Sequence, residues 1–360
     1  MGKYTRTQPQ LTVTEIGMIG VLGSLAIAVN SLTGPAMLSL PATFQRSGLI
    51  PTTMCIVFVG ILCSLCCLHM ADTISKVPNN FQFKQNVEFS GVFQTFWGRK
   101  WFVVTHFIYF CCITCLNISS IVDNSQVVDT ILGHSVPDGS WAIQFNTTGT
   151  YWIRWDPESC TDEELFQGIC VAFAGVEGVL MTAGYVLTTL VFLPMALMDL
   201  KENSAWQIIG FAVLILVSLQ FAAEFIVKGL NTDNLSLWGE SWDTLVGVVL
   251  FNFSLVIAVP AWLCERHQSV HVPTVIHSSN ALAILLYMLV GILGALAIPT
   301  VAENMLESMM SGAFGTSMQL GASFFAFMIV GLGIPLFSVL TRMNLTGSGL
   351  CSERFGNILA

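Results

Sequence analysis

The residues best placed to do chemistry in this chain lie where two long apolar segments are interrupted. The first segment has four interrupting residues near its middle: Asn30, Thr33, Gly34 and Pro35. A proline has no N–H to donate to a helix and a glycine has little conformational preference, so a helix is predicted to break here. The break frees backbone N–H groups, which attract a carboxylate, and backbone carbonyls, which attract a cation or an ammonium group.

The second interrupted segment has the same character. It carries Asn252 and Ser254 at its middle, followed by Pro260. Paired interruptions at corresponding positions in the two halves of a chain are typical of inverted-repeat transporters, whose binding site lies between the repeats. Proline and glycine are also common in ordinary membrane helices, so a simple kink that binds no ligand is the alternative interpretation.

Both segments belong to a chain with the composition of an all-α polytopic membrane protein. Charged residues make up 10% of the sequence and hydrophobic residues 54%, whereas soluble domains have about 25% charged residues. Hydropathy predicts eight spans that are long enough to cross a hydrocarbon core of roughly 30 Å. These spans are Ile16–Phe44, Ile50–Ala71, Trp101–Ile121, Val179–Met198, Trp206–Val227, Leu245–Leu263, Ala281–Thr300 and Met318–Leu340.

The sequence contains no recognisable catalytic motif. No Ser-His-Asp, zinc-protease or phosphate-loop spacing occurs, so an enzyme is not expected, and no catalytic residue, metal site or cofactor is predicted. A net charge of −9 without a cluster of Lys and Arg excludes a nucleic-acid-binding protein. The expected partners are the lipid bilayer and a small molecule bound within it.

The distribution of basic residues predicts a cytosolic N-terminus. With this orientation ten Lys and Arg residues lie inside, and three lie outside: Arg46, Arg154 and Lys228. Such an excess on the cytosolic side is what the positive-inside rule requires. Residues 1–15 are then a cytosolic tail, 16–340 form the transmembrane domain, and 341–360 are a cytosolic loop with the start of a ninth span.

The same orientation makes predictions for the non-cytoplasmic loops. Asn146 and Asn234 begin glycosylation sequons there. Cys160 and Cys170 lie in the long loop before the fourth span, and a disulfide between them is possible although spacing alone does not specify it.

The two interrupted segments resemble the amino acid/auxin permease family. The resemblance is carried by NSLTGPAMLSLP (Asn30–Pro41) and by FNFSLVIAVPAWLCE (Phe251–Glu265). It implies the LeuT-like inverted-repeat fold of the amino acid/polyamine/organocation superfamily, with a first repeat at about 16–228 and a second that begins at about 245. Because family members have more spans than eight, the second repeat is expected to be truncated in this chain.

The resemblance also implies a substrate site. The carboxylate of an amino acid would face the backbone of the first break, at Thr33, Gly34, Pro35 and Ala36. Its side chain would lie against the second break, at Phe251, Asn252, Phe253 and Ser254. Neither break contains an acidic or basic side chain, which favours a neutral amino acid.

The same resemblance also bears on the identity of the coupling ion. Asn30 matches an asparagine that ligates sodium in sodium-coupled relatives, but Gly333 stands where a hydroxyl ligand would be needed. A proton or simple exchange is therefore favoured over sodium. The expected function is secondary active transport of amino acids by alternating access, in a vacuolar, lysosomal or plasma membrane. A membrane sensor that binds amino acids without transport, or an inactive truncated permease, is the alternative.

Overall fold

The computed structural model describes residues 18–78, 80, 83, 85, 87–136, 138–147, 149–156, 160, 172–173, 175–310 and 314–347. This part of the chain is mostly helical. Six of its helices are long and apolar enough to cross a membrane, and one bent pair of helices makes a seventh span. The polytopic helical class is therefore confirmed, whereas the eighth span is not.

The first span is broken where the sequence predicted. Two residues, Thr33 and Gly34, separate α1 (Val21–Leu32) from the 3-10 helix η1 (Pro35–Ser39), which leads into α2 (Leu40–Ser47). The helix axis bends by 48° between α1 and the segment Pro35–Ser47. Pro35 occupies the first turn of η1, where an intrahelical N–H is not needed. The proline therefore begins the new helix instead of kinking the old one.

The sixth span is interrupted as well. α9 (Leu245–Asn252) ends at Phe253, a short 3-10 helix η4 (Leu255–Ile257) follows, and α10 (Val259–Glu265) completes the span. Pro260 lies in the first turn of α10 and not at the break itself. The interruption therefore falls at Phe253 and Ser254, upstream of the proline.

The remaining helices complete the bundle. They are α3 (Leu49–Ser75), α4 (Phe89–Trp97), α5 (Arg99–Ser135), α7 (Ala183–Ala196), α8 (Leu200–Lys228), η3 (Thr232–Asn234), α11 (Val272–Ala297), α12 (Met305–Met310), α13 (Thr316–Phe325), the π-helical turn η5 (Ala326–Val330) and α14 (Gly331–Gly347).

The expected fourth span, Val179–Met198, is shorter than predicted. Its first residues form strand β3 (Val179–Thr182), and only α7 continues as a helix. Thr182 caps α7 by accepting a hydrogen bond from the Tyr185 N–H, while the Asp129 carboxylate accepts one from the Gly184 N–H. At 14 residues, α7 is about 21 Å long, which is too short to cross the bilayer upright.

The all-α expectation is wrong for the loop between α5 and α7. Strands β1 (Trp141–Asn146), β2 (Gly149–Arg154) and β3 form an antiparallel sheet in the order β2-β1-β3. Aromatic and β-branched residues favour strands, and the rings of Trp141 and Trp152 stack across β1 and β2 with centroids 4.7 Å apart. Hydropathy over long windows does not detect such short elements.

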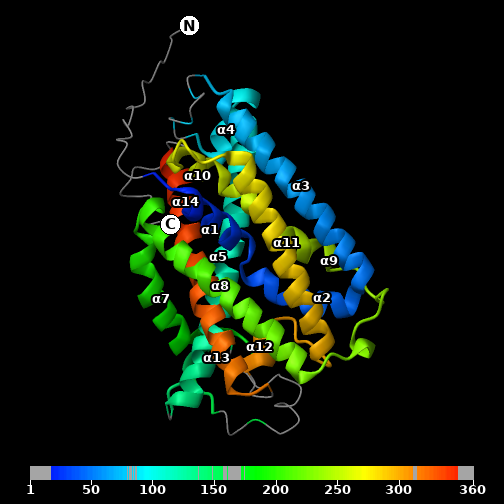
Figure 1. Ribbon diagram of the computed structural model, residues 1–360. Helices are drawn as coiled ribbons and strands as arrows, with labels where there is room; N and C mark the ends of the chain where they lie inside the picture. The colour runs from blue at the N-terminus through cyan, green and yellow to red at the C-terminus, as the bar shows by residue number, and fades with distance from the viewer. Residues whose placement is uncertain are drawn as a thin grey trace.

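The helices pack as two groups (Figure 1). The broken-span group contains α1, α2, α3, α9, α10 and α11, and the flanking group contains α5, α7 and α14. α8 contacts α1 and α11 in the first group and α14 in the second, so it lies between them. The broken first span runs through the middle of the molecule beside α8 and α11 (Figure 1).

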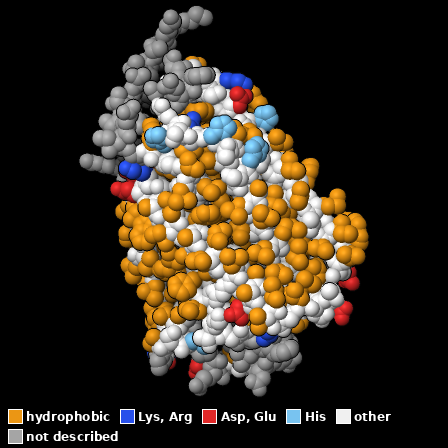
Figure 2. All heavy atoms as spheres, in the orientation of Figure 1, with side chains coloured by type: hydrophobic (Ala, Val, Ile, Leu, Met, Phe, Trp, Pro, Cys, Tyr) orange, Lys and Arg blue, Asp and Glu red, His pale blue; other side chains and the backbone are white. Residues whose placement is uncertain are grey.

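The outer surface suits a lipid environment. Large apolar side chains are exposed along several helices, among them Phe58 and Ile61 on α3, Phe107 and Ile108 on α5, and Leu216 and Leu219 on α8. Figure 2 shows a broad hydrophobic band across the visible face, with charged side chains near its two ends. Exposed apolar surface of this extent would make a soluble protein aggregate, whereas hydrocarbon tails cover it without penalty.

Candidate functional site

The two helix breaks lie against each other although they are more than 200 residues apart in sequence. The Asn252 side-chain amide donates to the Ala36 carbonyl at 3.1 Å, and the Ser254 hydroxyl lies 3.4 Å from the Ser31 carbonyl. Each bond joins a residue near one break to the backbone near the other. The sequence-predicted substrate residues of the first and sixth spans are therefore brought together in one place.

The first break leaves space in front of its backbone. Thr33 ends α1 by bonding the Val29 carbonyl with both its N–H and its hydroxyl. Gly34 follows in an extended conformation, and a Cβ atom built on it would meet no atom within 4 Å. Open space beside a break in a buried helix is what a bound ligand requires.

The second break presents a polar group of its own. Asn252 is almost fully buried, and its amide nitrogen bonds the Ala36 and Val248 carbonyls. Its Oδ1 atom is buried and accepts no hydrogen bond from the described residues. A buried carboxamide oxygen without a donor is costly, so this atom is suited to accept a hydrogen bond from a ligand.

The two phenylalanines beside Asn252 face different neighbours. Phe253 is buried, and its ring packs edge-on against the ring of Tyr287 of α11, with the ring centroids 5.4 Å apart. Phe251 is partly buried and packs with the hydrophobic cluster that includes Tyr109 of α5 and Phe337 of α14. Phe251 is thus the residue of this pair directed toward the flanking group.

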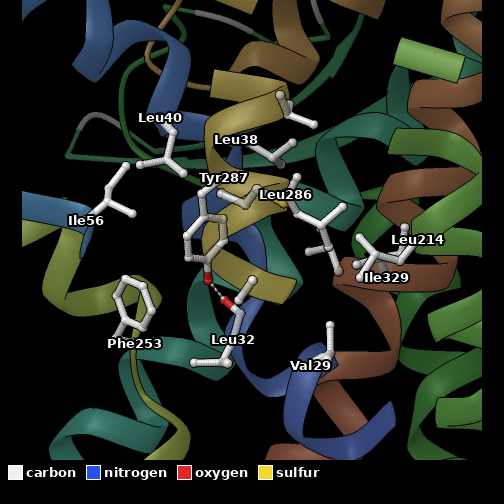
Figure 3. Packing of buried hydrophobic residues seen from close by; sticks show 14 of the residues in the cluster. Val29, Leu32, Leu38, Leu40, Ile56, Leu214, Phe253, Leu286, Tyr287 and Ile329 are labelled. Carbon is white, nitrogen blue, oxygen red and sulfur yellow. Dashed lines mark hydrogen bonds between the residues drawn. The ribbon is translucent and has the colours of Figure 1, made fainter. Parts of the chain in front are cut away.

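Tyr287 is the residue of this site that sequence reasoning missed. Its hydroxyl lies 2.5 Å from the Leu32 carbonyl (Figure 3) and 3.1 Å from the Asn252 carbonyl, so it contacts the final residue of α1 and of α9. The side chain is fully buried. The only hint in the sequence is that Tyr287 is the single polar side chain in 281–297.

Asn30, the predicted ion ligand, is held by the fifth span. Its amide nitrogen donates to the Gln207 backbone carbonyl at 2.8 Å and to Gln207 Oε1 at 2.7 Å. The Gln207 amide in turn donates to Asn203 Oδ1 at 2.9 Å and to the Leu332 carbonyl at 3.1 Å. This buried chain of amides joins α1 to α8 and α14, and it leaves Asn30 Oδ1 without a partner among the described residues.

The predicted modification sites differ in accessibility. Asn146 is exposed at the end of β1, whereas the Asn234 amide nitrogen, the atom that would carry a glycan, donates to the Leu296 carbonyl at 3.0 Å. Cys160 is disulfide-bonded, but Cys170 lies outside the described residues, so their pairing stays a prediction.

Glycosylation is therefore expected at Asn146 in preference to Asn234. In cells with a secretory pathway, Asn146→Gln should remove the mass shift that peptide N-glycosidase F produces, because it deletes the accessible acceptor. Asn234→Gln is the matched control and should leave that shift unchanged. A shift that survives Asn146→Gln would mean that another asparagine, such as Asn234, is the acceptor, and no shift in the wild type would mean that the loop faces the cytosol.

These features define a polytopic helical membrane protein with two helix breaks that lie against each other. Residues 17–134 match the family model described as transmembrane amino acid transporter protein. The match covers about a third of the chain and includes the first break, and over this range it supports the resemblance found in the sequence. A search of curated proteins found no match to the chain.

Proposed function

We propose that this protein is a secondary active transporter of neutral amino acids that works by alternating access. The observation that carries the proposal is the pairing of the two breaks, with the last carbonyls of α1 and α9 both within 3.1 Å of one hydroxyl. Two helix C-termini that meet at one point concentrate negative potential, which suits the ammonium group common to all amino acids. By resemblance to the family, the carboxylate would face the backbone from Thr33 to Ala36.

The proposal of a neutral substrate rests on the side chains at the breaks. From Thr33 to Ala36 and from Phe251 to Ser254 the residues are apolar or uncharged. A charged substrate side chain would lose its hydration in this site without gaining an opposite charge, and that loss is costly in a low-dielectric environment. A neutral side chain avoids this cost.

Alternating access would come from rocking of the broken-span group against the flanking group, as in inverted-repeat transporters. Two sets of polar contacts between described residues of the molecule would have to rearrange in this motion. Asn304, in the loop after α11, donates to the Asp123 carboxylate of α5 at 3.0 Å. The second contact is the chain of amides from Asn30 through Gln207. The site would open to one side of the membrane when these contacts rearrange.

Coupling to a proton, or exchange without an ion, is proposed in preference to sodium. Both hydrogens of the Asn30 amide point to Gln207 oxygens, so only its Oδ1 atom remains for an ion. A sodium site needs several oxygens around the ion, and Gly333 supplies no side-chain oxygen. A cytosolic N-terminus and a LeuT-like fold are part of the same proposal.

The proposal is tested by counterflow in proteoliposomes. Vesicles loaded with an unlabelled neutral amino acid should accumulate the labelled one, and replacing sodium by N-methylglucamine should leave the rate unchanged. A dependence of counterflow on sodium would overturn the proposed coupling. Binding of the label without accumulation would instead identify an amino acid sensor, and no binding of any amino acid would refute the proposed substrate class.

A further inference from the structure

The Tyr287 hydroxyl, from a third helix, contacts the backbone of both broken spans at their helix ends. It contacts the carbonyl of Leu32, the last residue of α1 (Figure 3), and the carbonyl of Asn252, the last residue of α9. Both carbonyls have lost the helical N–H that would otherwise satisfy them, because each helix ends there. One side chain of α11 therefore fixes the distance between two helix ends that come from opposite halves of the chain.

We infer that Tyr287 is a positioning residue, which holds these two carbonyls at the spacing that binds the ammonium group of the substrate. The inference rests on the proposed function and deepens it. A carbonyl oxygen can accept two hydrogen bonds, and the phenol has a single proton to share between two carbonyls. Acceptor capacity therefore remains on both oxygens, and an ammonium group with three donors can use it while the hydroxyl stays in place.

The surroundings of Tyr287 place it behind the breaks and not among the flanking helices. Its helix packs against α1, α2, α3 and α8. Its ring meets Phe253 edge-on, and Cys63 of α3 lies 3.5 Å from the Phe253 carbonyl. Tyr287, Phe253 and Cys63 all belong to the broken-span group. We call the contact of the Tyr287 hydroxyl with both carbonyls the clamp. It would move with the broken-span group and keep the carbonyls aligned in every state of the transport cycle.

Tyr287→Phe tests the inference because it removes only the hydroxyl. The KM for a neutral amino acid is expected to rise about tenfold, because the variant loses the hydrogen bonding that orients the two carbonyls. The kcat is expected to change by less than about threefold. The preference for a primary amine over its N-methyl analogue should also fall, because the two carbonyls no longer hold their spacing. A loss of folding alone would change neither the KM nor this preference.

Tyr109→Phe provides the matched control. Tyr109 on α5 is also buried, and its hydroxyl donates to a single backbone carbonyl, that of Leu340, at 3.2 Å. This variant deletes the same atom in a similar environment but removes no hydrogen bond to the Leu32 or Asn252 carbonyl. Its KM and its preference for the primary amine should match those of the wild type.

Hydrogen–deuterium exchange gives a readout that needs no substrate. In Tyr287→Phe, amide exchange should accelerate at 33–36 and 253–255, and in Tyr109→Phe it should not. Unchanged exchange in these segments would contradict the inference that Tyr287 holds the two breaks in place. Faster exchange with an unchanged KM would overturn its role in binding. If the wild type binds no amino acid, the proposed function fails and the role in ammonium binding fails with it, while exchange still decides whether the clamp exists.

Discussion

Gly34→Val is expected to weaken amino acid binding about 100-fold and to leave the protein folded in the membrane. A Cβ at Gly34 meets no atom within 4 Å, and the residue has a φ of −78°, which any residue adopts. The valine side chain would therefore occupy the open space in front of the first break without disturbing the protein. If the substrate carboxylate lies there, affinity should fall about 100-fold, or roughly 2.7 kcal/mol, as in an overpacked site.

The measurement is equilibrium binding of a labelled neutral amino acid to purified Gly34→Val. Gly247→Val is the control, because Gly247 is an exposed glycine of α9 whose added Cβ would also meet no atom within 4 Å. That variant should bind like the wild type. Wild-type affinity in Gly34→Val would show that the substrate does not occupy this space, and the site assignment would be wrong.

Gln207→Leu is expected to cause the largest loss of stability. Gln207 is fully buried, and its side chain accepts from Asn30 and donates to Asn203 and to the Leu332 carbonyl. Leucine has a similar size but removes three buried hydrogen bonds, those with Asn30, Asn203 Oδ1 and the Leu332 carbonyl. The loss of each costs about 1–3 kcal/mol, so the free energy of unfolding should fall by about 3 kcal/mol or more.

The corresponding change in the apparent melting temperature in detergent is a decrease of about 5 °C. Gln220→Leu serves as the comparison, since Gln220 lies on the same helix and bonds Ser317 at the protein surface. Its replacement should alter the melting temperature by less than about 1 °C, because water can satisfy the groups that it leaves. Equal changes in the two variants would contradict a special role of the buried chain of amides.

Local sequence features predicted the membrane class and the broken helices because their causes act over a few residues. A proline and a glycine within an apolar segment disrupt a helix in any environment, and the observed break after Leu32 agrees with this. The start of the helix within Val179–Met198 could not be predicted from local sequence. Pairing of β3 with β1 and the Asp129 bond to Gly184 decide where α7 begins, and both depend on partners far along the chain.

The candidate site likewise combines features that depend on local sequence with contacts that depend on distant partners. The interruptions of the first and sixth spans can be read from the amino acids alone, because helix-breaking and apolar character belong to each residue and its immediate neighbours. Long-range packing sets the bonds of Asn252 to Ala36 and of Asn30 to Gln207. It also makes Tyr287 span both breaks. These contacts depend on how helices from distant parts of the chain pack, and a single buried polar atom in an apolar span does not reveal which carbonyl it will meet.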